Sequence, residues 1–283
     1  DKRKNTGYPS YIGTDEYRQE ISEWYKRRFQ VNLDYQKEVT SSIGAKEAVF
    51  NFPQAFLNEG DYVISPNPGY PPYERGTLFA HGNIYFVPLL KENNFLMDFD
   101  SIKKEIIKKS KILWINYPNN PTGAIATEQF LKEAIDFGHD NGIIIASDEC
   151  YTEIYFGDRP HSILEYTKEG VVAFQSLSKR SAMTGYRVGF LAGDENIISA
   201  FKKLKTNIDS GTPTFIQDAA IAALKDEDHV EKMRRDYKQK RDILVDGLTS
   251  AGLEDCTPDA TLYLWQKTPK NILKHNKKIL KIS

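Results

Sequence analysis

The 283-residue sequence has few cysteines, no long apolar run and no excess of charge of one sign. Its two cysteines, Cys150 and Cys256, cannot form a disulfide framework for a chain of this size, so a reducing, cytoplasmic location is expected. The longest uninterrupted apolar run, residues 219–224, is far shorter than the roughly 20 residues of a membrane span. Lys and Arg number 38 against 39 Asp and Glu, without the basic excess typical of nucleic-acid binding. We therefore expect neither a membrane nor a nucleic acid as a partner.

Several motifs that define common enzyme classes are also missing. The sequence contains no G-x-G-x-x-G after a strand, no Walker A loop and no G-x-S-x-G elbow. It contains no H-E-x-x-H, and its five histidines do not show the spacing of a metal site. These absences remove the main sequence support for hydride transfer, serine hydrolysis and metal-dependent hydrolysis, and no metal is expected.

Apolar strand patterns alternate with helical patterns along most of the chain. The strand patterns are residues 62–65, 84–87, 112–116, 143–147, 171–175 and 188–192, and the helical ones are residues 14–29, 44–57, 98–109 and 127–140. Because this alternation is typical of βαβ units, we predict an α/β fold whose mainly parallel sheet is sandwiched between helices. A long helical stripe begins near Asp228, so we place a large domain at 1–227 and part of a small C-terminal α+β domain at 228–283.

Polar clusters follow the predicted strands, at the sheet edge where parallel sheets bind ligands. These clusters, with two that lie upstream, are residues 116–123, 147–151, 176–180, 185–189, 43–47 and 68–71. Together they offer a lysine, an acid, an arginine, an amide, a phenol, an aromatic face and a turn that opens a helix. Pyridoxal phosphate needs such a set, because its aldehyde binds a lysine, its ring nitrogen an acid, and its phosphate cations and backbone donors.

Four of these clusters contain residues in the order and spacing of a known family. They are PNNPTG at 118–123, SDE at 147–149, and SLSK at 176–179 with Arg187 eight residues after the lysine. With these motifs the chain resembles the fold-type I, class I and II aminotransferases that depend on pyridoxal phosphate. The resemblance implies the fold-type I transferase architecture, with a large cofactor-binding domain, and transfer of an amino group between an amino acid and a 2-oxo acid.

Within this family the chain is most similar to the succinyldiaminopimelate aminotransferases, on the strength of residues 67–76, 178–181 and 261–265. That likeness favours succinyldiaminopimelate with glutamate and 2-oxoglutarate, in lysine biosynthesis. Three alternatives stay open: an aspartate-type or other aminotransferase, a β-lyase that uses the same cofactor, and a non-catalytic protein that binds it.

The resemblance assigns a catalytic role to three residues. Lys179 would bind the cofactor aldehyde and move the substrate proton, Asp148 would pair with the ring nitrogen, and Tyr151 would hydrogen-bond the ring oxygen. Asn120 would contact the same oxygen, and Tyr70 would stack on the ring. The residues alone are equally consistent with turn positions for Asn120 and Tyr70 and with a core position for Tyr151.

The resemblance also assigns the cofactor phosphate to a turn and three side chains, namely Gly44, Ala45, Lys46, Ser176, Ser178 and Arg187. Such a turn suits an anion, because glycine permits close approach and the free N–H groups that open a helix attract negative charge. Tyr8 would reach the phosphate of a neighbouring subunit, which implies a homodimer with shared active sites.

The two ends of the chain depart from the family pattern. Family members have more residues before Tyr8, and they continue beyond residues 262–265 into a part that carries an arginine for the substrate α-carboxylate. Here a Lys-rich tail, residues 270–283, follows instead and matches no family segment. We therefore expect a fragment or processed product with a nearly complete cofactor site and an incomplete substrate site.

Overall fold

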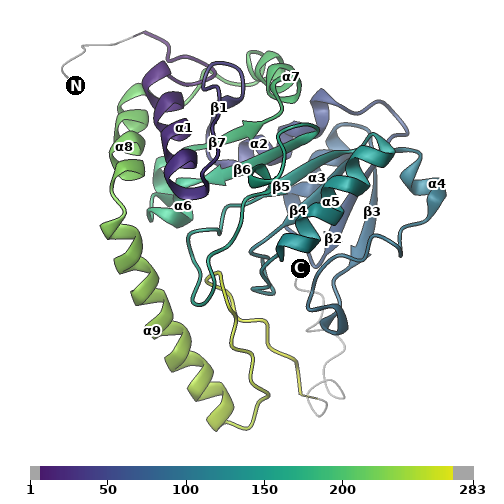
Figure 1. Ribbon diagram of the computed structural model, residues 1–283, viewed down its shortest axis with the longest axis vertical. Helices are drawn as coiled ribbons and strands as arrows, with labels where there is room; N and C mark the ends of the chain where they lie inside the picture. The colour runs from purple at the N-terminus through teal and green to yellow at the C-terminus, as the bar shows by residue number, and fades with distance from the viewer. Residues whose placement is uncertain (1–6, 270–283) are drawn as a thin grey trace.

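The computed structural model of the chain describes residues 7–269, and its centre is a seven-stranded sheet (Figure 1). The strands are β1 (Val39–Ser42), β2 (Tyr62–Asn67), β3 (Asn83–Pro88), β4 (Ser110–Asn116), β5 (Ile144–Asp148), β6 (Val171–Ser176) and β7 (Gly189–Gly193). They lie in the order β1-β7-β6-β5-β4-β2-β3. From β3 to β6 all neighbours are parallel, and β7 runs antiparallel to both β6 and β1. The predicted mainly parallel sheet is thus confirmed.

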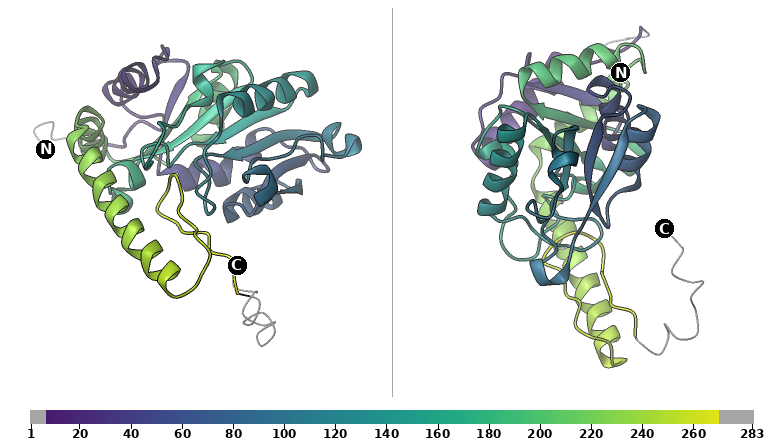
Figure 2. Two further views of the ribbon diagram at one scale, coloured as in Figure 1. Left: turned by 60° about the horizontal axis from the view of Figure 1, so that its bottom comes forward. Right: turned by 90° about the vertical axis from the view of Figure 1, so that its right-hand side faces the viewer.

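Helices cover both faces of this sheet (Figures 1 and 2). The α-helices are α1 (Asp15–Phe29), α2 (Ala45–Asn51), α3 (Pro71–Phe79), α4 (Lys104–Ile107), α5 (Glu128–Asn141), α6 (Leu177–Arg180), α7 (Glu195–Lys205), α8 (Thr214–Lys225) and α9 (Asp228–Ser250). Short 3-10 turns are η1 (Phe52–Ala55), η2 (Lys91–Asn93), η3 (Ile163–Glu165) and η4 (Thr184–Tyr186). Helices α1, α5 and α8 pack on one face, and α2, α3 and α7 pack on the other. No helix among the described residues is long and apolar enough to cross a membrane.

Strand β4 shows why the sheet needs helices on both sides. Successive side chains of a strand point to opposite faces. Leu113 and Ile115 belong to the apolar cluster under α1 and α5, whereas Ile112 and Trp114 belong to the cluster under α2 and α7. All four side chains are buried. An uninterrupted apolar strand is therefore stable only between two helical layers, as the sequence pattern predicts.

The predicted helix ends are right at two helices and wrong at a third. The hydroxyls of Thr14 and Thr127 cap the first turns of α1 and α5, and Gly142 ends α5 at a φ of 62°. The helix predicted for residues 98–109 is only one turn long, at α4. Asp98 explains the difference: its carboxylate accepts the N–H of Asp100, and its carbonyl accepts the Ser101 hydroxyl. Such local bonds compete with helix formation.

Helix α9 leads away from the sheet, and the segment after it returns toward the sheet (Figure 2). An isolated β-bridge between Tyr155 and Ala260 joins this returning segment to the loop after β5. The predicted boundary near Asp228 coincides with the start of α9, although the division at 227 into two domains stays a prediction. The Lys-rich tail at 270–283 lies outside the described residues.

Candidate active site

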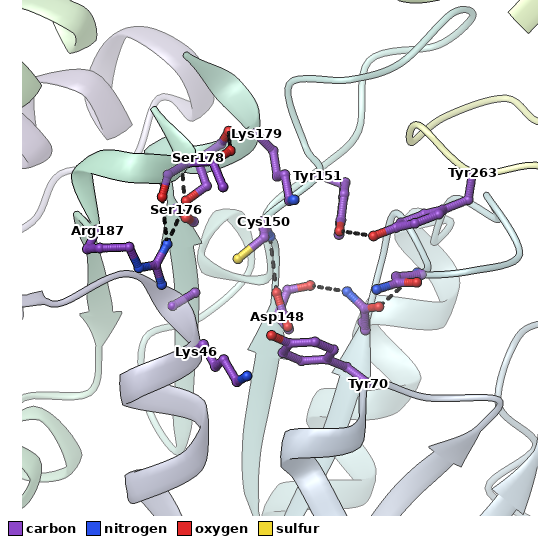
Figure 3. Close-up of a pocket in the computed structure, with 14 residues that line it drawn as sticks. Lys46, Tyr70, Asp148, Cys150, Tyr151, Ser176, Ser178, Lys179, Arg187 and Tyr263 are labelled. Carbon is purple, nitrogen blue, oxygen red and sulfur yellow. Dashed lines mark hydrogen bonds between the residues drawn. The ribbon is translucent and has the colours of Figure 1, made fainter. Parts of the chain in front are cut away.

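A cavity of about 410 Å³ opens where β4, β5 and β6 end (Figure 3). Parallel strands bring their carboxyl ends to one edge, so the last residues of these strands, Asn116, Asp148 and Ser176, meet there. Every predicted site residue except Gly44 and Tyr8 lines the cavity. The lining residues are Ala45, Lys46, Tyr70, Asn116, Asn120, Asp148, Cys150, Tyr151, Ser176, Ser178, Lys179, Thr184, Arg187 and Tyr263.

Lys179 lies on α6, a single helical turn that directly follows β6. The Ser176 hydroxyl caps this turn by accepting the N–H of Ser178 at 3.2 Å, and the buried Leu177 anchors it in the core. The lysine side chain therefore projects into the cavity, where its Nζ lies 6.0 Å from the centre of the Tyr151 ring. Figure 3 shows Lys179, on the helical turn after β6, and Asp148, at the end of the neighbouring strand β5, facing the same space.

Asp148 is a buried carboxylate, with 5% of the residue exposed. Its Oδ2 accepts the Tyr73 hydroxyl at 2.7 Å, and its Oδ1 accepts the N–H of Cys150 at 3.2 Å. Burial raises the pKa of Asp148 above its ordinary value, and these hydrogen bonds oppose the rise. Between residues 7 and 269, Asp148 forms no ion pair. A carboxylate that is buried without a cation is suited to a ligand that brings a positively charged N–H.

Tyr70 lies at the start of α3 and lines the same cavity. Its ring packs edge-on against Tyr73, with the ring centres 5.8 Å apart. Burial, with a smaller contribution from the charge of Asp148, raises the pKa of Tyr70 to about 12. The phenol is therefore neutral at neutral pH, and it offers an aromatic face next to the buried acid.

Asn120 is held in the cavity wall by a second asparagine. Asn116 accepts the N–H of Asn120 at 2.9 Å and donates its amide N–H to the carbonyl of Asp148 at 2.9 Å. The loop that carries Asn120 is thus fastened directly to the strand that carries Asp148.

Tyr151 shares a hydrogen bond with Tyr263, whose hydroxyl lies 2.8 Å from its own. Tyr263 belongs to the segment that returns after α9, so this segment forms part of the cavity wall (Figure 3). Burial and the Tyr263 hydroxyl raise the pKa of Tyr151 above its ordinary value, which keeps the phenol protonated and able to donate.

Arg187 and the turn at residues 43–46 enclose one end of the cavity. Arg187 precedes β7 with a φ of 55°, and its Nη1 donates to the Thr184 carbonyl at 3.0 Å and to Ser178 Oγ at 3.4 Å. Gly44 has a φ of 71°, and a Cβ at this position would lie 2.5 Å from Arg187 Nη2. Gly44 therefore does not line the cavity but lets the turn approach the guanidinium. Ala45 and Lys46 follow it and face the cavity.

Several residues in the wall of the cavity or directly behind it were not predicted. Tyr73 contacts Asp148 and lies one helical turn after Tyr70, a spacing that could have pointed to it. Cys150 is partly buried and lines the cavity. Burial and the Asp148 charge raise the pKa of its thiol. Tyr8 is 88% exposed and lies outside the cavity, so it adds nothing to the site of its own chain.

The donor set of the cavity fits pyridoxal phosphate. Lys179 offers an amine for the aldehyde, and Asp148 offers a buried carboxylate without a cation for the ring nitrogen. At the other end, Arg187 and the close turn at Gly44 form a cradle that a Cβ would fill. Amine, acid and cradle are thus available within one cavity of a size typical of ligand sites.

Comparison with known proteins gives a consistent result. The sequence profile of the family described as "Aminotransferase class I and II" matches residues 1–281. Curated relatives include the LL-diaminopimelate aminotransferase of Aquifex aeolicus, 47% identical over 271 residues, which cover 94% of this chain and 70% of the relative. The enzyme of the same name from Halothermothrix orenii is 46% identical over 267 residues, which cover 93% of this chain and 69% of the relative.

Solved structures resemble this chain in fold as well as in sequence. An aminotransferase from Neisseria meningitidis superposes with a TM-score of 0.87 at 37% identity, covering 93% of this chain and 69% of the other. A probable N-succinyldiaminopimelate aminotransferase from Thermus thermophilus superposes with a TM-score of 0.88 at 28% identity, covering 94% of this chain and 72% of the other. The likeness therefore spans more than nine-tenths of the chain.

Proposed function

The chain belongs to the class I and II aminotransferases, which use pyridoxal phosphate, and we propose that it transfers an amino group between LL-diaminopimelate and a 2-oxo acid. Amino acids and 2-oxo acids are the substrates of this family. The choice of diaminopimelate, and with it a place in lysine biosynthesis, is supported by relatives of that name at 43–47% identity. The observation that carries the reaction type is the cavity in which Lys179 faces the buried Asp148.

We propose that the residues of the cavity hold the cofactor in a fixed orientation. Asp148 would accept the ring N–H, Tyr70 would cover one ring face, and Asn120 and Tyr151 would donate to the ring oxygen. Tyr263 would orient Tyr151, because the two hydroxyls share a hydrogen bond. At the opposite end the phosphate would be bound by Ala45, Lys46, Ser176, Ser178 and Arg187, and Gly44 would let the backbone of the turn come close to Arg187.

Lys179 has two tasks in this proposal. When bound, pyridoxal phosphate supplies an aldehyde that takes up the amino group and a ring that withdraws electrons from the substrate α-carbon. The Lys179 amine would hold the cofactor until substrate arrives. It would then remove the proton from the substrate α-carbon as a base and, as the conjugate acid, deliver it to the carbon that came from the cofactor aldehyde. Asp148 keeps a negative charge beside the ring nitrogen, which favours the ring in its protonated, electron-withdrawing form.

We also propose that the enzyme is a homodimer with shared active sites. Tyr8 lies outside the cavity of its own chain with 88% of its surface exposed, so its side chain is available to a second copy. The two cysteines are free thiols, which is in keeping with a reducing compartment such as the cytoplasm. Sedimentation of the purified protein, with Tyr8→Ala as a variant, tests the dimer and the contribution of Tyr8 to cofactor affinity.

Absorption spectroscopy of the purified protein tests the reaction. Adding pyridoxal phosphate should produce a visible absorption change that Lys179→Ala abolishes. LL-diaminopimelate, added next, should convert the bound cofactor to its pyridoxamine form, and 2-oxoglutarate should reverse the change. A protein that binds no pyridoxal phosphate would refute the proposal.

The same experiment distinguishes the other candidates. Faster conversion by N-succinyl-LL-diaminopimelate or by aspartate would replace the proposed substrate. The succinylated substrate is favoured by the likeness to the probable N-succinyldiaminopimelate aminotransferase of Thermus thermophilus, at a lower identity than the LL-diaminopimelate enzymes. Release of ammonia would indicate a β-lyase, and a bound cofactor that no donor converts would indicate a non-catalytic protein.

A further inference from the structure

A completely buried lysine, Lys205, ends helix α7 behind the cavity. Its Nζ lies 3.1 Å from Oε2 of Glu47 and 2.5 Å from Oδ2 of Asp209. The side chains of these two acids are 14% and 13% exposed. Because a buried ammonium is strongly unfavourable without partners, a lysine at this position implies that its two ion pairs matter to the fold or to the site.

Glu47 connects this lysine to the wall of the cavity. The same Oε2 atom that binds Lys205 also accepts the N–H of Ile43 at 3.1 Å. Residues 43–46 form the turn that faces the cavity through Ala45 and Lys46. One carboxylate oxygen thus fastens the start of this turn to the buried ammonium.

The opposite side of the turn leaves little room for movement. Gly44 approaches Arg187 so closely that a Cβ would lie 2.5 Å from Nη2. Ser176 and Ser178, which line the same end of the cavity, are more than nine-tenths buried. A small shift of the turn would therefore change its distance from the guanidinium and from both serines.

We propose that Lys205 is a positioning residue for the cofactor phosphate, acting through Glu47 on the turn at residues 43–46. This inference rests on the proposed function, which assigns the phosphate to that turn. The ammonium acts in two ways. It holds the Glu47 carboxylate where it binds the Ile43 N–H, and it offsets negative charge behind a site for an anion. Lys205, Glu47 and Asp209 together carry one net negative charge, and without the ammonium the two acids would carry two.

Comparing two ligands isolates this effect. Pyridoxal phosphate and pyridoxal share the aldehyde and the ring, and only the first has the phosphate. In Lys205→Met, the ratio of pyridoxal phosphate affinity to pyridoxal affinity should fall about tenfold, because a hydrogen bond to a charged group contributes that much or more. Binding to the purified apoprotein is followed by absorption, without any substrate. Far-UV circular dichroism confirms that the variant is folded.

Three further variants sharpen the comparison. Lys205→Gln keeps a polar side chain that can donate to Glu47, and it replaces Lys205→Met if that variant does not fold. Its ratio of affinities should fall as well, because the positive charge is lost. Lys203→Met removes an exposed charge from the same helix and should leave the ratio unchanged. Asp209→Asn removes the acid that does not contact the turn, and the ratio should not fall, because the charge behind the turn becomes less negative.

The outcomes separate this inference from the proposed function. If the wild-type protein does not bind pyridoxal phosphate, the proposed function fails and the inference fails with it. If the wild type binds the cofactor while the Lys205 variants keep its ratio of affinities, the inference alone is overturned. Loss of stability with an unchanged ratio would likewise show that Lys205 only supports the fold.

Discussion

Replacing Tyr73 with phenylalanine should destabilise the apoprotein by an amount that depends on pH. The Tyr73 hydroxyl is buried and donates to Oδ2 of Asp148 at 2.7 Å. Its ring stacks on Trp114 with the centres 4.8 Å apart and the planes at 18°. Phenylalanine keeps this stacking, so the perturbation is confined to one hydroxyl group.

The magnitude follows from the charge of the acceptor. A hydrogen bond to a charged group contributes about 1.5–3 kcal/mol, against about 0.5–1.5 kcal/mol for a neutral one. Burial raises the pKa of Asp148 in the folded state, so the stability due to this group is fully present below its unfolded-state pKa and is lost as pH rises through the folded-state pKa. The Tyr73 hydroxyl offsets part of that loss. Tyr73→Phe should therefore cost about 1.5–3 kcal/mol where Asp148 is ionised, and less where it is protonated.

Urea denaturation of the apoprotein between about pH 4 and pH 8 measures this difference. Tyr117→Phe is the matched control, because the Tyr117 hydroxyl is also buried but donates to the neutral carbonyl of Phe95 at 2.9 Å. The cost of the control should not change with pH. An equal cost of Tyr73→Phe at every pH would refute the argument that the hydroxyl stabilises the charged form of Asp148.

Three further predictions concern other parts of the site. Gly44→Ala should cost about 1–3 kcal/mol and weaken pyridoxal phosphate binding, because φ 71° with ψ 159° is a conformation for glycine alone and the new Cβ meets Arg187; unchanged urea stability and cofactor affinity would contradict this. Burial raises the pKa of Glu149 from 4.5 to about 7, so its stabilising effect is lost as pH rises through about 7. Glu149→Gln should abolish that loss in urea denaturation, and a variant with the wild-type pH profile would disprove the assignment. Arg28→Met should cost about 1.5–3 kcal/mol, because it removes a charged hydrogen bond of 2.6 Å from the buried Glu153 and leaves only the longer ion pair with Arg234 at 3.6 Å; a urea midpoint close to that of the wild type would count against it.

The sequence predicted those parts of the fold and site that depend on local pattern. Apolar strands with helical segments between them predicted the sheet, and the motifs at the strand ends predicted the family, both of which are confirmed. The roles of the individual site residues stay predictions, although ten of the twelve predicted residues line one cavity.

Features that depend on tertiary packing were not predictable from the sequence. Strand β1, with the sequence VTSS, has no apolar run, and its burial comes from pairing with β7. The contact of Tyr263 with Tyr151 joins residues 112 positions apart. The burial of Lys205 was equally unpredictable, because α7 is amphipathic and rich in lysine and its sequence does not indicate which lysine is buried.

The reversal of chain direction at β7 determines how two residues of the site are spaced. Because β7 runs back beside β6, the connection between them leaves and re-enters the sheet at the same edge. Lys179 and Arg187 both lie on this connection, eight residues apart, and both line the cavity. The connection therefore fixes the spacing of two anchors that we propose for the cofactor, the Lys179 amine for the aldehyde and the Arg187 guanidinium for the phosphate. Inserting a single residue into it would misplace one anchor relative to the other, while the strands themselves could stay in register.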